Sequence, residues 1–186
     1  AKSLDKIGTG LAKIGVGLGM VAGLAVKSAM DWGAAVNDMV DKTGMAGEEA
    51  SKLLAITNRV GVSAEETGTM FSRFSRAAYD AAQAQETMKA GGAAATDAFT
   101  TMGISVTNLD GTMKSSSVLF GEVKALIADM PAGLQKTALE MEFFGRAGTK
   151  MDDMLNMTQT EMDETIKRAQ DMGLIMSTEA SAAWEQ

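Results

Sequence analysis

The chain contains no histidine and no cysteine, so the enzyme class we weigh is a hydrolase that works through carboxylates. The absence of histidine and cysteine excludes thiol nucleophiles, disulfides, Cys/His zinc sites and Ser–His relays. A carboxylate hydrolase would have to use Glu140, Glu142 or the adjacent Asp152 and Asp153. On a helix, positions two apart point roughly 200° from each other, so Glu140 and Glu142 do not share a site easily. We therefore expect no enzyme and no catalytic residue.

Two other acidic pairs are explained by helix capping. Gly44-Met45-Ala46-Gly47-Glu48-Glu49 is echoed seventeen residues later by Gly61-Val62-Ser63-Ala64-Glu65-Glu66. In each, the first glycine ends one helix and the glutamates lie in the first turn of the next, where the helix dipole favours negative charge. Ser63 and Glu66 also have the spacing of a capping box.

The turn Asn108-Leu109-Asp110-Gly111 resembles part of a calcium-binding loop. In that alignment the first and twelfth ligand positions are Val106 and Ser117, so both anchoring carboxylates are missing. We expect no calcium, no other metal and no cofactor.

Composition predicts an all-α fold. Ala, Met, Leu, Glu and Lys are good helix formers, and the chain has 16 methionines and one proline. Frequent turn signals between β-branched and aromatic strands, as in a sandwich or barrel, are not found. The net charge of −7 is uneven: residues 1–30 sum to +3 (four Lys, one Asp), and the remainder to −10 (13 basic, 23 acidic). The acidic part should repel DNA, so we expect no sequence-specific nucleic-acid binding.

The N-terminal segment is predicted to be an apolar, glycine-rich helix. Thirteen uncharged residues, Ile14 to Val26, are flanked by lysines, and counting back to Ile7 gives a run of twenty that includes Lys13. Gly15, Gly19 and Gly23 recur every four residues and line one face, which permits close approach of another helix. The run predicts either a tightly packed helix in a bundle or oligomer, or insertion into a membrane through residues 7–26.

From residue 31 onward the pattern predicts helices separated by breaks at Gly44, Gly61, Gly91-Gly92 and Gly103. Pro131 is expected at the first position of a further helix, where a missing N–H is tolerated. Expected inward faces are Leu119, Val123, Leu126, Ile127 and Met130 in one helix and Leu134, Ala138, Met141 and Phe144 in the next. Helices are also expected over 150–157 and 159–172, the latter behind Thr160 and Asp163. The missing initial Met and the helical pattern at the last residues indicate a segment of a longer polypeptide.

The most specific string is Phe143-Phe144-Gly145-Arg146-Ala147-Gly148-Thr149. It follows Met130-Pro131-Ala132-Gly133, and before that come Ala98-Phe99-Thr100-Thr101-Met102-Gly103-Ile104-Ser105-Val106, the Asp110-Gly111 turn and the two Gly-x-x-x-Glu-Glu echoes. This order, over residues 31–157, resembles the core region of tail tape measure proteins of tailed bacteriophages, also called phage minor tail proteins. Phe144, Gly145, Arg146 and Gly148 carry the family motif, and Trp32 departs from the smaller aromatic expected there.

The resemblance implies a structural role. Tape measure proteins lie inside the tail tube, set tail length, scaffold tube assembly and assist genome delivery across the host envelope. It implies contacts with the tube protein, tail tip or baseplate proteins, tail assembly chaperones and other copies of itself, as a trimer or hexamer. It implies a location inside the tail of the virion after synthesis in the host cytoplasm, and no catalytic residues.

We therefore predict an all-α protein, either a multi-helix bundle or an elongated helical assembly. Its parts would be a glycine-rich apolar helix (1–30) for packing or host-membrane contact, a tape-measure core (31–157) and continuing helices (158–186). The alternative is a membrane-active helical protein, pore-forming or holin-like, led by residues 7–26. A minimal pore-former would not need the large acidic body.

Overall fold

The computed structural model describes residues 24–93 and 97–176, and over these residues the fold is all-α with no β-strand. One isolated antiparallel bridge joins Thr107 and Met113. The helical elements are α2 (Leu24–Thr43), α3 (Gly47–Arg59), α4 (Ala64–Lys89), α5 (Ala98–Thr101), α6 (Ser116–Ala128), α7 (Leu134–Phe144), the 3-10 helix η1 (Gly145–Met151), α8 (Asp152–Leu155) and α9 (Gln159–Asp171). The predicted all-α class is confirmed.

The first helix junctions form as the glycine and capping signals predict. Gly44 and Gly61 have φ of +68° and +79°, a left-handed conformation that glycine adopts without a side-chain clash, and each follows the end of a helix. The predicted capping box at the start of α4 is present. The Ser63 hydroxyl accepts from the Glu66 N–H, and the Glu66 carboxylate accepts from the Ser63 N–H, both at 3.2 Å. These bonds satisfy donors that would otherwise be unpaired at the helix start.

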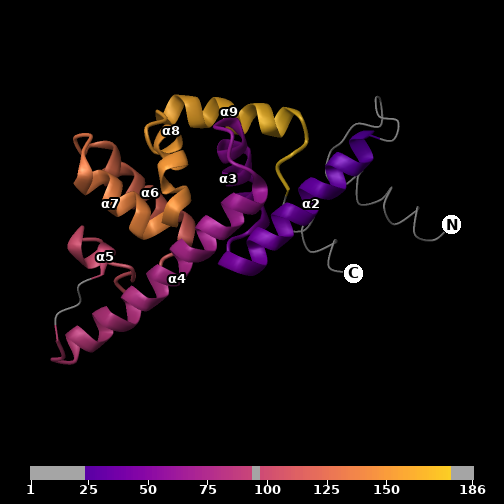
Figure 1. The fold of residues 1–186 in the computed structure, drawn as a ribbon. Helices are drawn as coiled ribbons and strands as arrows, with labels where there is room; N and C mark the ends of the chain where they lie inside the picture. The colour runs from indigo at the N-terminus through magenta and orange to yellow at the C-terminus, as the bar shows by residue number, and fades with distance from the viewer. Residues whose placement is uncertain (1–23, 94–96, 177–186) are drawn as a thin grey trace.

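The helices pack on both sides of α4, the longest of the described helices (Figure 1). α2 lies against α4, and α9 lies across α3. α6 and α7 contact α4 on the other side, and α8 packs against α6. Two long-range bonds tie the last described residues to this frame: the Trp32 indole N–H donates to the Leu174 carbonyl at 2.7 Å, and the Met176 N–H donates to the Ser51 hydroxyl at 3.1 Å.

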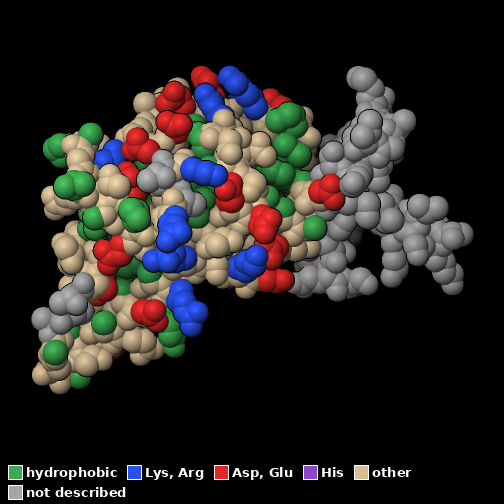
Figure 2. Space-filling model, viewed as in Figure 1, with side chains coloured by type: hydrophobic (Ala, Val, Ile, Leu, Met, Phe, Trp, Pro, Cys, Tyr) green, Lys and Arg blue, Asp and Glu red, His purple; other side chains and the backbone are tan. Residues whose placement is uncertain are grey.

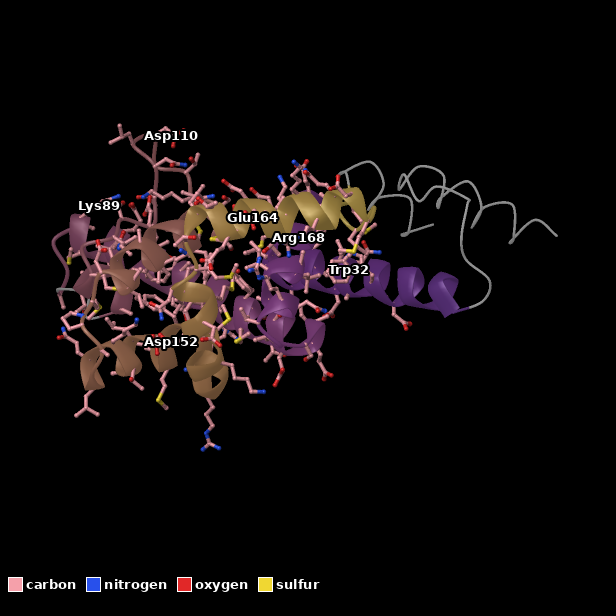
Figure 3. All side chains as sticks on the ribbon, turned by 90° about the horizontal axis from the view of Figure 1, so that it is seen from above. Trp32, Lys89, Asp110, Asp152, Glu164 and Arg168 are labelled. Atoms are coloured by element: carbon pink, nitrogen blue, oxygen red, sulfur yellow. The ribbon has the colours of Figure 1, made fainter. Side chains whose placement is uncertain are left out.

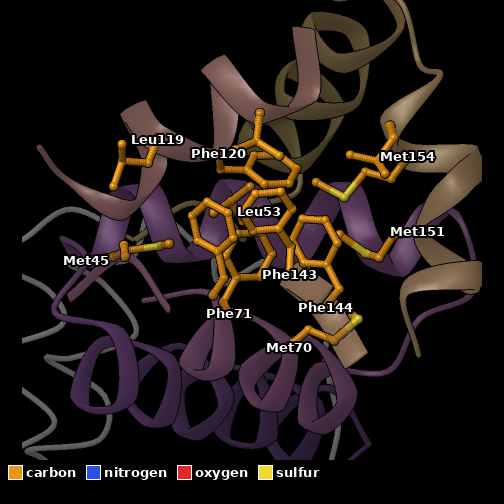
Figure 4. Close-up of a cluster of buried hydrophobic side chains, with 14 of the residues drawn as sticks. Met45, Leu53, Met70, Phe71, Leu119, Phe120, Phe143, Phe144, Met151 and Met154 are labelled. Atoms are coloured by element: carbon orange, nitrogen blue, oxygen red, sulfur yellow. The ribbon is translucent and has the colours of Figure 1, made fainter. Parts of the chain in front are cut away.

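All six phenylalanines of the chain gather in one core (Figure 4). They are Phe71, Phe74, Phe99, Phe120, Phe143 and Phe144, and each is buried. Phe74 stacks on Phe144 with ring centroids 5.6 Å apart, and Phe99 meets Phe143 edge to face at 4.9 Å. Rings in such offset and edge-on pairs attract each other beyond their burial from water. Met70, Met151 and Met154 fill the space around the rings.

The helix that precedes the motif differs from the prediction in its start. Pro131 is not its first residue: α7 begins at Leu134, and residues 131–133 form a bend. Gly133, with φ of 161° and ψ of −178°, is extended rather than helical. Glycine is the least favourable residue in a helix apart from proline, so the turn that contains Gly133 directly after Pro131 does not extend α7 towards its N-terminus.

The predicted inward face of α7 is wrong at three of its four positions, because only Phe144 is buried as predicted. Leu134 is 92% exposed and Met141 is 45% exposed, and Ala138 lies on the same outer side. The buried side of the helix holds Lys136 and Glu140 together with the two phenylalanines.

Smaller corrections concern α6 and α9. In α6, Leu119, Val123 and Ile127 are buried as predicted, but Leu126 is exposed and Met130 only half-buried. α9 is capped by Thr158 with Glu161, a second capping box, rather than by Thr160 with Asp163.

Candidate functional site

The motif string forms the turn between α7 and η1. Its two phenylalanines end α7 and fill the aromatic core, where Phe143 is fully buried and Phe144 nearly so. Gly145 follows with φ of +71°, and its N–H donates to the carbonyl of Met141, which ends the helix. The aromatic pair therefore fixes the rotation of α7 about its own axis, and Gly145 lets the chain leave the helix directly after the second ring.

Gly148 allows the chain after this turn to pack directly on the backbone of α7. A β-carbon built at this position would lie 2.7 Å from the Glu140 carbonyl carbon, closer still to its oxygen, and 3.3 Å from the Met141 nitrogen. These neighbours are backbone atoms, which do not rotate away as a side chain would. The close approach of η1 to α7 therefore requires glycine here.

Arg146 is exposed and lines a groove of about 430 Å³ between the first turns of α4 and the α7–η1 turn. The full lining is Glu65, Glu66, Thr69, Met70, Arg73, Phe144, Gly145 and Arg146. The Arg73 side chain lies along Gly145 and donates from Nε to the Glu142 carbonyl at 3.4 Å. The groove thus presents guanidinium and carboxylate groups beside the apolar side chains of Met70 and Phe144.

Glu66 links the groove to the capping box. Its carboxylate pairs with the Lys150 ammonium at 2.6 Å, and the hydrogen bonds from Lys150 and from the Ser63 N–H and hydroxyl hold the pKa of Glu66 below its ordinary value. The ion pair joins residue 150 of η1 to the start of α4. Glu66 is therefore ionised and structurally engaged, and it is not poised for proton transfer.

A buried polar cluster lies beneath α7 and includes two of the carboxylates considered for catalysis. Glu140 is 3% exposed, and its Oε1 atom has no hydrogen-bond partner among the described residues. Burial, and then the charge of Asp152 on α8, raise the pKa of Glu140. Lys136, 8% exposed, pairs with Asp152 at 3.3 Å and donates to Asn156 at 3.1 Å. This cluster can retain a proton on Glu140, but Glu140 does not line the groove and is closed to a substrate.

The remaining acidic candidates lie apart from this cluster. Glu142 is exposed on α7 while Glu140 is buried, in agreement with their predicted divergence. Asp110 accepts from the N–H and hydroxyl of Thr112 at 2.9 and 2.6 Å, and these bonds lower the pKa of Asp110. It forms the tip of a tight turn, and no cluster of three or more metal-ligating side chains occurs within the described part of the chain.

Sequence reasoning missed Lys136 and Arg73. The Lys136 and Glu140 pair has the i, i+4 spacing of a solvent-exposed ion pair, so its burial gives no signal in the sequence.

Gly15, Gly19 and Gly23 lie outside the described residues, as does most of the 7–26 segment. Within residues 24–93 and 97–176, no helix is both long and apolar enough to cross a membrane.

Comparison with known proteins finds no family model, no curated protein and no solved structure that matches this chain.

Proposed function

We propose that this chain is a structural segment of a tail tape measure protein of a tailed bacteriophage. In that role it lies in the lumen of the tail tube, helps to set tail length and scaffold tube assembly, and assists genome delivery across the host envelope. The observation that carries the proposal is the ordered series of motifs that ends in the Phe143–Thr149 string.

The place of these motifs in the fold supports a structural role. The glycine echoes form the junctions before α3 and α4, and the Ala98–Val106 segment brings Phe99 into the aromatic core. The Phe143–Thr149 string closes that core with two rings and two glycines that permit close packing. These motif residues therefore specify one packed unit of helices, and their side chains are used for packing and capping.

Charge and side-chain type are compatible with a conduit for DNA. Residues 31–186 carry a net charge of −10 from 23 acidic and 13 basic residues, so passing DNA would not be held. Met151, Met154 and Met157 are buried, whereas Met113 and Met141 are exposed. Flexible methionine side chains at a surface adapt to different partners, as an interface that assembles and later releases requires.

The partners that follow from this proposal are the tail tube protein, tail tip or baseplate proteins, tail assembly chaperones and further copies of the chain as a trimer or hexamer. Residues 7–26 would make any contact with the host membrane. No cofactor is required.

Protease protection tests the proposed location. Virions of the phage that encodes this chain are purified, their tails are separated from heads, and the tails are treated with protease before and after the tube is opened with guanidinium chloride. The chain should be present and protected in closed tails and degraded in opened tails. Absence from tails, or digestion in closed tails as fast as in opened ones, would contradict the proposal.

A further inference from the structure

Within the described part of the chain, Lys136 and Glu140 are the two charged residues that are buried. Other charged side chains lie at the surface, as Figure 2 shows over α9 along the top of the molecule, where acidic and basic groups are exposed to water. Burying an ionised carboxylate is unfavourable unless the group is paired and hydrogen-bonded. The Oε1 atom of Glu140 has no hydrogen-bond partner among the described residues, so this site stabilises an ionised Glu140 poorly.

Glu140 and Asp152 share one proton across the contact between α7 and α8. Their side chains form a hydrogen bond, and two carboxyl groups can do so only when one of them carries a proton to donate. Asp152 is the ionised member, because its Oδ1 atom accepts from the Asn156 amide at 2.8 Å and pairs with the Lys136 ammonium at 3.3 Å. Glu140, 3% exposed and beside that negative charge, is therefore the protonated member.

The charges of this cluster balance only while Glu140 keeps its proton. The cluster then contains one anion, Asp152, and one cation, Lys136. Without the proton, two carboxylates face a single ammonium group, which also donates to the Asn156 oxygen at 3.1 Å, and one negative charge is left uncompensated in a buried site. Deprotonation therefore replaces a hydrogen bond between α7 and α8 with repulsion between two carboxylates.

The charged groups of the other elements at this corner do not compensate Glu140. Among the described residues, the charges that act on it are those of Asp152 and Lys136. α5 carries no charged residue, and Arg146 of η1 lines the groove, which Glu140 does not. The remaining cations of α4, η1 and α6 are bound elsewhere: Arg73 to the Glu142 carbonyl, Lys150 to Glu66, and Lys124 to the Met157 carbonyl.

We propose that Glu140 and Asp152 form a proton-operated latch, which docks α8 on α7 while Glu140 is protonated and loosens α8 when Glu140 is ionised. Met151, Met154 and Leu155 are fully buried next to Asp152, with both methionines close to the aromatic rings (Figure 4). Loosening the latch therefore exposes methionine side chains, which adapt readily to new partners. This inference rests on the buried cluster and is independent of the tape measure proposal.

The direction of the pH effect follows from the raised pKa of Glu140 in the docked state, which burial and the charge of Asp152 cause. In the undocked state Glu140 is in water and titrates near its ordinary pKa of 4.5. Between these two pKa values the docked state holds a proton that the undocked state lacks. The equilibrium constant for opening therefore rises with pH in that window, by up to about tenfold per pH unit, and is constant outside it.

Amide hydrogen exchange of the full-length chain, followed by NMR between pH 4.5 and pH 8, tests the proposal. The quantity compared is the protection factor, the ratio of the intrinsic to the observed exchange rate, because the intrinsic rate itself depends on pH. The Asn156 N–H, which donates to the Asp152 carbonyl at 2.9 Å, reports on α8. The second half of α9 is the reference, because Arg168 lies well apart from Asp152 (Figure 3).

Two variants of α7 separate the latch from a general effect of pH. Glu140→Gln cannot ionise but still donates a hydrogen bond, so its α8 protection factor should be constant with pH. Glu142→Gln is the matched control, an exposed glutamate on the same helix, and should behave as the unmodified chain does. In the unmodified chain the α8 protection factor should fall at least about threefold over this range while that of α9 stays constant.

The carboxyl carbon shift of Glu140 in the unmodified chain gives a second measurement that requires no variant. It should titrate with a midpoint above pH 4.5. A midpoint at or below that value, an equal fall in protection at α8 and α9, or the same fall at α8 in Glu140→Gln would overturn the proposal.

Discussion

Replacing Gly148 by alanine should strongly destabilise the fold, although it adds a single methyl group. The new β-carbon would lie 2.7 Å from the Glu140 carbonyl carbon and 3.3 Å from the Met141 nitrogen. Because both neighbours belong to the backbone of α7, η1 must move away from α7, and Phe144 moves with the turn that joins them. Overpacking of this kind costs typically 1–3 kcal/mol, and a contact with fixed backbone belongs at the upper end, about 3 kcal/mol. For a chain of this size that corresponds to a fall in melting temperature of about 6–12 °C.

Gly121→Ala is the matched control for this substitution. Gly121 lies inside α6, and a β-carbon there would meet nothing within 4 Å. Alanine should therefore stabilise the helix by about 0.5–1 kcal/mol through its higher helix propensity. Urea unfolding followed by circular dichroism at 222 nm measures both variants. If Gly148→Ala is within about 0.5 kcal/mol of the unmodified chain, the close packing of η1 on α7 is not as described.

Three further substitutions, two of them with a control variant, test the core, the capping box and the buried cluster. Phe144→Ala should cost about 3–5 kcal/mol in urea unfolding, whereas Leu134→Ala should change stability by less than about 0.5 kcal/mol. Equal losses would contradict the orientation of α7, in which Phe144 is buried and Leu134 is exposed. Ser63→Ala should cost about 1 kcal/mol by removing a helix cap. Because the pKa of Glu66 is lowered in the fold, the ionised carboxylate contributes to the free energy of unfolding above pH 4.5. This contribution is lost as the pH falls below that value. The pKa of Glu140 is raised in the fold, so the protonated carboxyl contributes fully to the free energy of unfolding below pH 4.5. This contribution is lost as rising pH ionises the buried carboxyl. Glu140→Gln should thus stabilise the chain by about 1 kcal/mol at pH 7 and lose this advantage near pH 4.5, while exposed Glu142→Gln changes little; a destabilised Glu140→Gln at pH 7 would refute this reading.

Local signals predicted most of the helix boundaries. The all-α class, the glycine stops and the Ser63–Glu66 capping box depend on interactions within a few residues, and such interactions are visible in the sequence. In α3, Leu53, Leu54 and Thr57 are buried along one side of the helix, and helical periodicity makes such a stripe visible in the sequence.

The orientation of α7 could not be predicted in this way. Its sequence offers two candidate inner faces, and periodicity alone does not rank them. The choice depends on Phe143 and Phe144 reaching rings supplied by α4, α5 and α6, which are distant in sequence. The cluster of Lys136 and Glu140 and the Arg73 side of the groove follow from that choice, so they too depend on tertiary packing.

Tail length tests the central claim most directly. Under the proposed function, the chain is encoded by a tailed phage. In that phage, a helical insertion of about 70 residues is placed after Ser181, outside the described fold, and tails are measured by electron microscopy. At ~1.5 Å per helical residue, the account predicts tails longer by about 105 Å. Tails of unchanged length that nevertheless contain the lengthened chain would contradict it.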